Sequence, residues 1–247
     1  MRPSKTALLV FVAVTTAGAQ APDSLLSETR LTVHTLVRED IFAGFRNDNM
    51  ERFAKGEQHI EALMKLRPGE RANLLAWKGG ASTYRAVLAH EAGKPEEFTR
   101  RFAEARQAFA EAAQLTSGND GVAAITGGTM ATFADRLPEQ HRALAWSLAY
   151  DNYSVLWKMQ GASIDKLPVH FKGEVLAGLT QSAQRTGRTE EAAQYLDKML
   201  TVMADTPYEA TAKQWKSDPS SIATTTLICK NCHAPGRLAN RLEALQK

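Results

Sequence analysis

Residues 173–206, GEVLAGLTQSAQRTGRTEEAAQYLDKMLTVMADT, contain the pattern that decides the fold of this chain. Gly187 separates two helix-forming runs, as expected of the turn between two paired helices. Two glutamates open the second run, where carboxylates favour a helix N-terminus. Leu196 and Met199 follow Ala192 by four and seven positions, so all three share one helical face. The stretch therefore predicts a helix hairpin.

Similar hairpins are expected throughout residues 24–216. Ala, Leu, Glu, Arg and Gln dominate this region, and alternating β-branched residues are nearly absent. Turn and capping residues divide it into about eight helices, which predicts an all-α fold, an α-α solenoid of about four hairpins. The expected pairs are 24–45 with 49–67, 71–91 with 96–115, 120–135 with 139–160, and 168–185 with 189–203.

Small and bulky residues recur at corresponding places in these hairpins. The small ones are Gly44, Gly56, Ala105 and Ala192, the bulky ones Ile60, Phe109 and Leu196, and the large aromatics of a first helix Trp77 and Tyr84. Pro68 stands where such a unit often closes. With these positions, most of residues 37–206 resembles tetratricopeptide repeats. The resemblance implies a concave surface that binds a protein partner, expected here to be a redox protein.

Both cysteines of the chain fall in one motif, Cys229-Lys-Asn-Cys-His233. Two thiols one helical turn apart can form thioethers with the two vinyl groups of one haem, and the adjacent imidazole can bind its iron. The segment resembles the haem-attachment site of c-type cytochromes. The resemblance assigns Cys229 and Cys232 as the covalent anchors of one haem c and His233 as an axial iron ligand, which implies electron transfer.

Other interpretations of the cysteine pair stay open. A Cys229–Cys232 disulfide would leave a helical interaction scaffold without a cofactor. A metal site would lack a fourth protein ligand nearby, and structural zinc usually has four. A haem iron with an open coordination position would instead favour an enzyme with peroxidase-like or gas-binding chemistry, although no acid–base group stands near the motif.

The source of a second iron ligand is not evident from the motif. Small cytochromes c take this ligand from downstream, but residues 234–247 contain neither Met nor His. The candidates within the repeats are Met199 and Met203 on the last repeat helix, and His170 at the start of the helix before it. Residues 237–245 have amphipathic spacing, and we expect this helix to cover one haem face or to dock on the repeats.

The N-terminus predicts export. Arg2 and Lys5 precede a short apolar run, and the small residues that end at Ala19 suit signal peptidase, so residues 1–19 are expected to be a cleaved signal peptide. Export would place the chain in the periplasm or outside the cell. Haem c is attached outside the cytoplasm, and thiols there do not stay reduced by default.

The composition excludes several other classes of protein. Removing Arg2 and Lys5 leaves 28 basic against 27 acidic residues, so nothing favours nucleic acid or an anionic membrane surface as a partner. Because no long apolar run follows the leader, no membrane-spanning helix is expected. The sequence also contains no phosphate-loop motif and no nucleophile-elbow motif. The expected divisions are 1–19 leader, 20–216 repeats, 217–228 linker and 229–247 haem segment.

Overall fold

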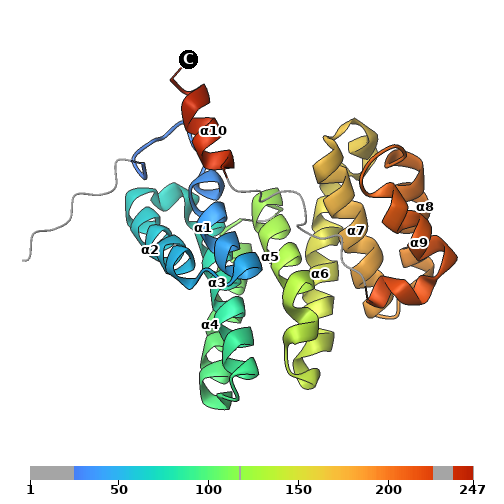
Figure 1. Cartoon of the computed structure of the whole chain (residues 1–247), viewed down its shortest axis with the longest axis horizontal. Helices are drawn as coiled ribbons and strands as arrows, with labels where there is room; N and C mark the ends of the chain where they lie inside the picture. Colours follow the sequence, from blue (N-terminus) through green and yellow to red (C-terminus); the bar gives the residue numbers. More distant parts are fainter. Residues whose placement is uncertain (1–24, 117, 225–235, 247) are drawn as a thin grey trace, which may run out of the picture.

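The computed structural model describes residues 25–116, 118–224 and 236–246. These residues form ten α-helices and no β-strand (Figure 1), and none of these helices has the length and apolar character to cross a bilayer. The helices are α1 (Val33–Asn47), α2 (Met50–Leu66), α3 (Arg71–Glu91), α4 (Pro95–Leu115), α5 (Asp120–Phe133), α6 (Glu139–Gln160), α7 (Val169–Arg185), α8 (Thr189–Val202), α9 (Glu209–Ser217) and α10 (Arg237–Ala244). Short 3-10 helices are η1 (Pro68–Glu70), η2 (Ala134–Arg136), η3 (Gly161–Lys166) and η4 (Pro219–Ala223).

The first eight helices pack as four successive pairs: α1 with α2, α3 with α4, α5 with α6, and α7 with α8. This confirms the four predicted pairings. Each first helix also contacts the next first helix along the chain, from α1 to α3, α5 and α7 (Figure 1). The first helices therefore form a continuous layer, and the second helices lie beside it.

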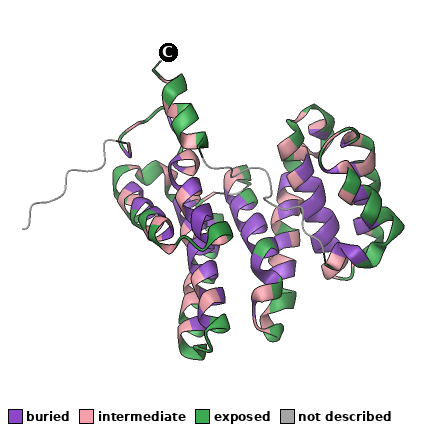
Figure 2. Ribbon diagram, viewed as in Figure 1, coloured by how far each residue is buried: buried purple, intermediate pink, exposed green. Residues whose placement is uncertain are grey.

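Small residues allow the two helices of a pair to approach closely. A Cβ atom on Gly44 of α1 would lie 2.6 Å from Cδ2 of Phe53 on α2. A Cβ atom on Gly56 of α2 would lie 2.9 Å from Cδ1 of Ile41 on α1. Any larger residue at either position would overlap the facing helix. The buried residues accordingly gather on the facing sides of the helices (Figure 2).

The helix predicted from residue 24 was wrong over its first turns, because α1 begins at Val33. The hydroxyl of Thr32 accepts a hydrogen bond from the amide of Thr35 at 3.2 Å, as an N-cap does. Before this cap, backbone carbonyls accept hydrogen bonds from the guanidinium of Arg67 at 2.7–2.8 Å. Within the segment, the amides of Glu28 and Leu31 donate to the carbonyls three residues earlier, at 3.1 and 3.2 Å, so the chain forms turns that Arg67 holds in place.

Regular structure continues past the last predicted pair. Helix α9 follows Pro207 and buries Trp215 completely. Helix η4 lies within the predicted linker 217–228 and buries Ile222. The side-chain amide of Gln181 on α7 donates a hydrogen bond to the carbonyl of Ile222 at 3.2 Å. The first part of this segment thus packs on the last helix pair.

The substitution Gly44→Ala is expected to lower the free energy of unfolding by about 1–3 kcal/mol, because the added methyl group meets the Phe53 ring. Urea unfolding at neutral pH measures the change. Gly69→Ala is the matched control: a Cβ atom at this exposed position has no neighbour within 4 Å, so no loss is expected. Equal stability of the two variants would contradict the role given to Gly44.

Candidate functional site

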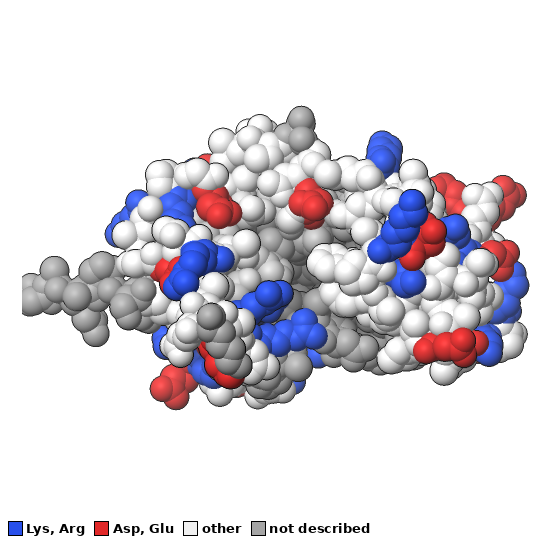
Figure 3. Space-filling view, turned by 90° about the horizontal axis from the view of Figure 1, so that it is seen from above, with Lys and Arg blue, Asp and Glu red and all other residues white. Residues whose placement is uncertain are grey.

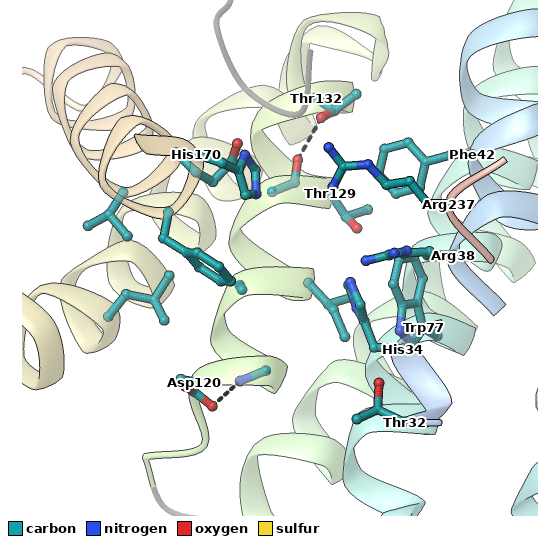
Figure 4. Close-up of a pocket in the computed structure, with 18 of the residues that line it drawn as sticks. Thr32, His34, Arg38, Phe42, Trp77, Asp120, Thr129, Thr132, His170 and Arg237 are labelled. Atoms are coloured by element: carbon teal, nitrogen blue, oxygen red, sulfur yellow. Dashed lines mark hydrogen bonds between the residues drawn. The ribbon is translucent and has the colours of Figure 1, made fainter. Parts of the chain in front are cut away.

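A cavity of about 870 Å³ is lined by helices α1, α3, α5, α6, α7 and α10 (Figure 4). This volume is within the range of small-molecule and cofactor sites. The wall formed by α1 and α3 is aromatic, since the rings of Phe42 and Trp77 meet edge to face with centroids 6.1 Å apart. Further apolar side chains come from α1, α5, α6 and α7: Phe45, Ile125, Leu156, Phe171 and Val175.

Two histidines lie on opposite walls of this cavity (Figure 4). His34 belongs to the first turn of α1, and its ring centroid is 5.2 Å from that of Trp77. His170 belongs to the first turn of α7, with its ring centroid 5.3 Å from that of Phe171. The indole Nε1 of Trp77 is buried at this wall and has no hydrogen-bond partner among the described residues. The site thus combines apolar rings with a few polar nitrogen atoms.

Both imidazoles are less basic than a histidine in water. The pKa of His34 is lowered to about 4, chiefly by burial and further by the charges of Arg38 and His170. The pKa of His170 is also lowered, again chiefly by burial; Glu174 opposes this shift, and Arg237 and Arg38 add to it. At pH 7 both side chains are therefore neutral, which is the form of imidazole that binds metal ions.

The end of the cavity next to α10 is basic. Arg38, Arg237 and Arg241 line the cavity, and its carboxylates are Asp120 and Glu174 among the described residues. Figure 4 shows Asp120 at the end away from Arg38 and Arg237. Figure 3, which looks onto the α10 side of the molecule, shows Lys and Arg side chains beside the central hollow. This end suits a ligand that carries anionic groups.

Helix α10 lies over the cavity because the N-terminal region of the chain holds both of its ends. The carboxylate of Glu39 on α1 accepts hydrogen bonds from the amides of Gly236 and Leu238, both at 2.7 Å. At the other end, the guanidinium of Arg30 donates a hydrogen bond to the carbonyl of Leu245 at 3.1 Å. An anion at the N-terminus and a cation at the C-terminus both match the helix dipole. Helix α10 thus docks on α1 and on the segment before α1, which is one of the two alternatives that its amphipathic spacing left open.

The predicted attachment residues Cys229, Cys232 and His233 lie outside the described residues, as do the predicted leader 1–19 and its cleavage site. Within the described ranges, no three His, Cys, Asp or Glu side chains gather as a metal site. The assignment of these three residues therefore stays a prediction from the sequence.

The three candidates for a second iron ligand lie in different places. Met199 and Met203 are completely buried in the hydrophobic core, and neither lines the cavity. His170 does line it. Sequence reasoning missed His34. His34, Arg38 and Phe42 follow one another at intervals of four residues, which places all three on one face of α1. This mixed polar and aromatic face was the signal for a site.

Glu39→Ala is expected to release α10, because two charge-assisted hydrogen bonds, each worth about 1.5–3 kcal/mol, are lost. Amide hydrogen exchange within residues 236–246 should become at least about tenfold faster. Glu61→Ala is the control, since Glu61 pairs with Lys78 on the surface of α2 and α3. Unchanged protection of α10 in Glu39→Ala would show that this carboxylate does not hold the helix.

His34→Gln is expected to make the protein less sensitive to acid. An unfolded histidine titrates near pH 6.5, whereas folded His34 titrates at about 4, so the unfolded chain binds more protons between these values and stability falls on acidification. This shift corresponds to about 2 kcal/mol lost between pH 7.5 and pH 5. Urea unfolding at both pH values should show a loss of stability in the parent that is smaller by this amount in His34→Gln, which keeps the contribution of His170. His90→Gln, at an exposed position, should behave like the parent, and equal pH sensitivity in all three proteins would refute the argument.

Comparison with known proteins identifies no family for this chain. No family model, no curated protein and no solved structure matches the chain. The protein is an all-helical chain whose helices pack in successive pairs around a cavity that α10 covers.

Proposed function

We propose that this protein is an exported mono-haem c-type cytochrome on a tetratricopeptide-like scaffold, and that it exchanges electrons with a protein partner. The observation that carries the proposal is the motif Cys229-Lys-Asn-Cys-His233, which contains every cysteine of the chain. Cys229 and Cys232 would hold one haem c through thioethers, and His233 would bind its iron. The bound haem would supply one-electron redox chemistry.

The position of α10 supports this proposal. Gly236, three residues after His233, is held by Glu39 at one wall of the cavity. On the other side of the motif, the carbonyl of Ile222 is held by α7. Both flanks of the motif are therefore attached to the helices that border the cavity.

The chemistry of the cavity also suits a haem. Its aromatic and aliphatic lining matches a flat apolar macrocycle. Arg38, Arg237 and Arg241 supply positive charge for the two propionate groups. A neutral imidazole, His34 or His170, is present on each of two walls. Of the two carboxylates in the described lining, Asp120 lies at the end away from Arg38 and Arg237 (Figure 4), and Glu174 accepts a hydrogen bond from Tyr153.

The arrangement of the helices supports the scaffold part of the proposal. Successive pairs in which each first helix contacts the next suit a solenoid of tetratricopeptide type. Such an array offers one extended surface to a partner, here a redox protein. The leader 1–19, with cleavage after Ala19, would bring the chain to the compartment in which haem c is attached.

The double variant Cys229→Ala, Cys232→Ala is expected to carry no covalent haem. The full chain with its leader is produced in a host that has the cytochrome c maturation machinery. Haem staining of a denaturing gel, a pyridine haemochrome spectrum and the intact mass are then measured. Lys230→Ala, Asn231→Ala is the matched control, because it keeps both thiols and their spacing, and it should carry one haem as the parent does.

A colourless parent would overturn the proposal. If its mass is that of the mature chain less two hydrogen atoms, the cysteine pair is a disulfide and the protein is an interaction scaffold. If the parent instead carries one haem whose iron is five-coordinate and high-spin, an enzyme with an open coordination position replaces the electron carrier.

A further inference from the structure

Helix α10 presents basic residues to the cavity, although it has apolar ones to offer. Its residues Leu238, Leu242 and Leu245 pack against the hydrophobic core. Arg237 and Arg241, one helical turn apart, line the cavity instead. A helix that served only to close the cavity would turn apolar residues toward it. The two arginines therefore indicate that this face of α10 meets an anionic ligand.

Arg38 of α1 adds a third positive charge near α10. Figure 4 shows the side chains of Arg38 and Arg237 entering the cavity from the same side. The charges of both lower the pKa of His170, so both act across the cavity on the wall formed by α7. The described lining contains three arginines against two carboxylates, and its imidazoles are neutral at pH 7. The cavity is therefore positively charged and disfavours a cationic ligand.

The rest of the lining is suited to an apolar body. The rings of Phe42 and Phe45 on α1 are in contact, with centroids 5.2 Å apart, and Phe42 also meets the indole of Trp77. On the opposite wall Phe171 is 54% exposed although it lines the cavity. An apolar ligand between these walls would remove the exposed ring from water, which favours binding.

We infer that this cavity binds an apolar molecule that carries carboxylate groups. The carboxylates lie at Arg38, Arg237 and Arg241, because a guanidinium binds a carboxylate through two parallel hydrogen bonds. The apolar body lies between the aromatic walls, in a volume of about 870 Å³ that accommodates a molecule of cofactor size. A tetrapyrrole with propionate groups and a long-chain fatty acid both have this chemistry. The inference goes beyond the proposed function, since every residue of this site belongs to the described part of the chain and none to the cysteine motif.

The test uses the full chain of the double variant Cys229→Ala, Cys232→Ala, in which any binding is noncovalent. The first probe is metal-free protoporphyrin IX, which has two propionates and no iron to coordinate. Because Trp77 lines the cavity, quenching of tryptophan fluorescence follows the titration, and a dissociation constant of about 1 µM or lower is expected. Palmitate is the second probe, titrated into the porphyrin complex and alone. Binding of the porphyrin without displacement by palmitate identifies a tetrapyrrole as the source, and binding of palmitate identifies a fatty acid; failure of both probes to bind would overturn the inference.

The part played by the carboxylates is tested with the dimethyl ester of protoporphyrin IX, which keeps the ring and loses both negative charges. The ester is expected to bind at least about tenfold more weakly than the acid. Arg237→Gln, made in the same cysteine-free chain, should weaken the acid at least about tenfold and leave the ester unchanged. Arg100→Gln is the matched control, because Arg100 pairs with Glu104 on the surface of α4, away from the cavity.

Equal affinity for the acid and the ester would overturn the inference, as would an Arg237→Gln protein that binds the acid as Arg100→Gln does. Far-UV circular dichroism verifies that each variant is folded. If Arg237→Gln does not fold, the comparison of acid with ester still decides, because it needs no further substitution. A parent chain without covalent haem would refute the proposed function alone, since these titrations are made without the two cysteines.

Discussion

The ring of Tyr153 on α6 is the contact on which the cavity depends. Its edge lies 3.4 Å from a Cβ position on Gly127 of α5, and its tip occupies the space where a side chain at Gly178 of α7 would stand. Its hydroxyl donates a hydrogen bond to Glu174 of α7. One completely buried side chain thus sets the spacing of three successive helices, all of which line the cavity. Because the core is close-packed, this spacing cannot adjust freely to a larger residue at either glycine.

The second constraint is electrostatic and connects the two ends of the chain. The carboxylate of Glu39 is almost completely buried, and a buried charge is stable only when it is hydrogen-bonded. The amides of Gly236 and Leu238 provide these hydrogen bonds. They attach the residues that follow the cysteine motif to α1, the first helix of the array. Helix α10 thereby lines the cavity together with α1, α3, α5, α6 and α7. Its residues Arg237 and Arg241 contribute to the basic end of the cavity.

These features together account for the proposed role. The helix pairs supply a rigid apolar surface, α10 supplies positive charge, and the two walls supply neutral imidazoles. An iron bound in such surroundings would change its charge with little rearrangement of solvent, as the proposed electron carrier requires. Arginines beside bound propionates would favour the reduced state, because reduction lowers the positive charge of the iron.

The sequence by itself determined the helices and their pairing, because helix spacing, caps and turn glycines are local properties that neighbouring residues specify. The bounds of α3 and α6 were predicted to the residue. The start of α1 was missed because Arg67, distant in sequence, binds the carbonyls of the preceding turn. The motif at Cys229 to His233 likewise predicts a ligand but no place for it. Only the tertiary structure decided that His34 and His170 line one cavity. Their proximity depends on the packing of α1, α5 and α7, which are remote from one another along the chain.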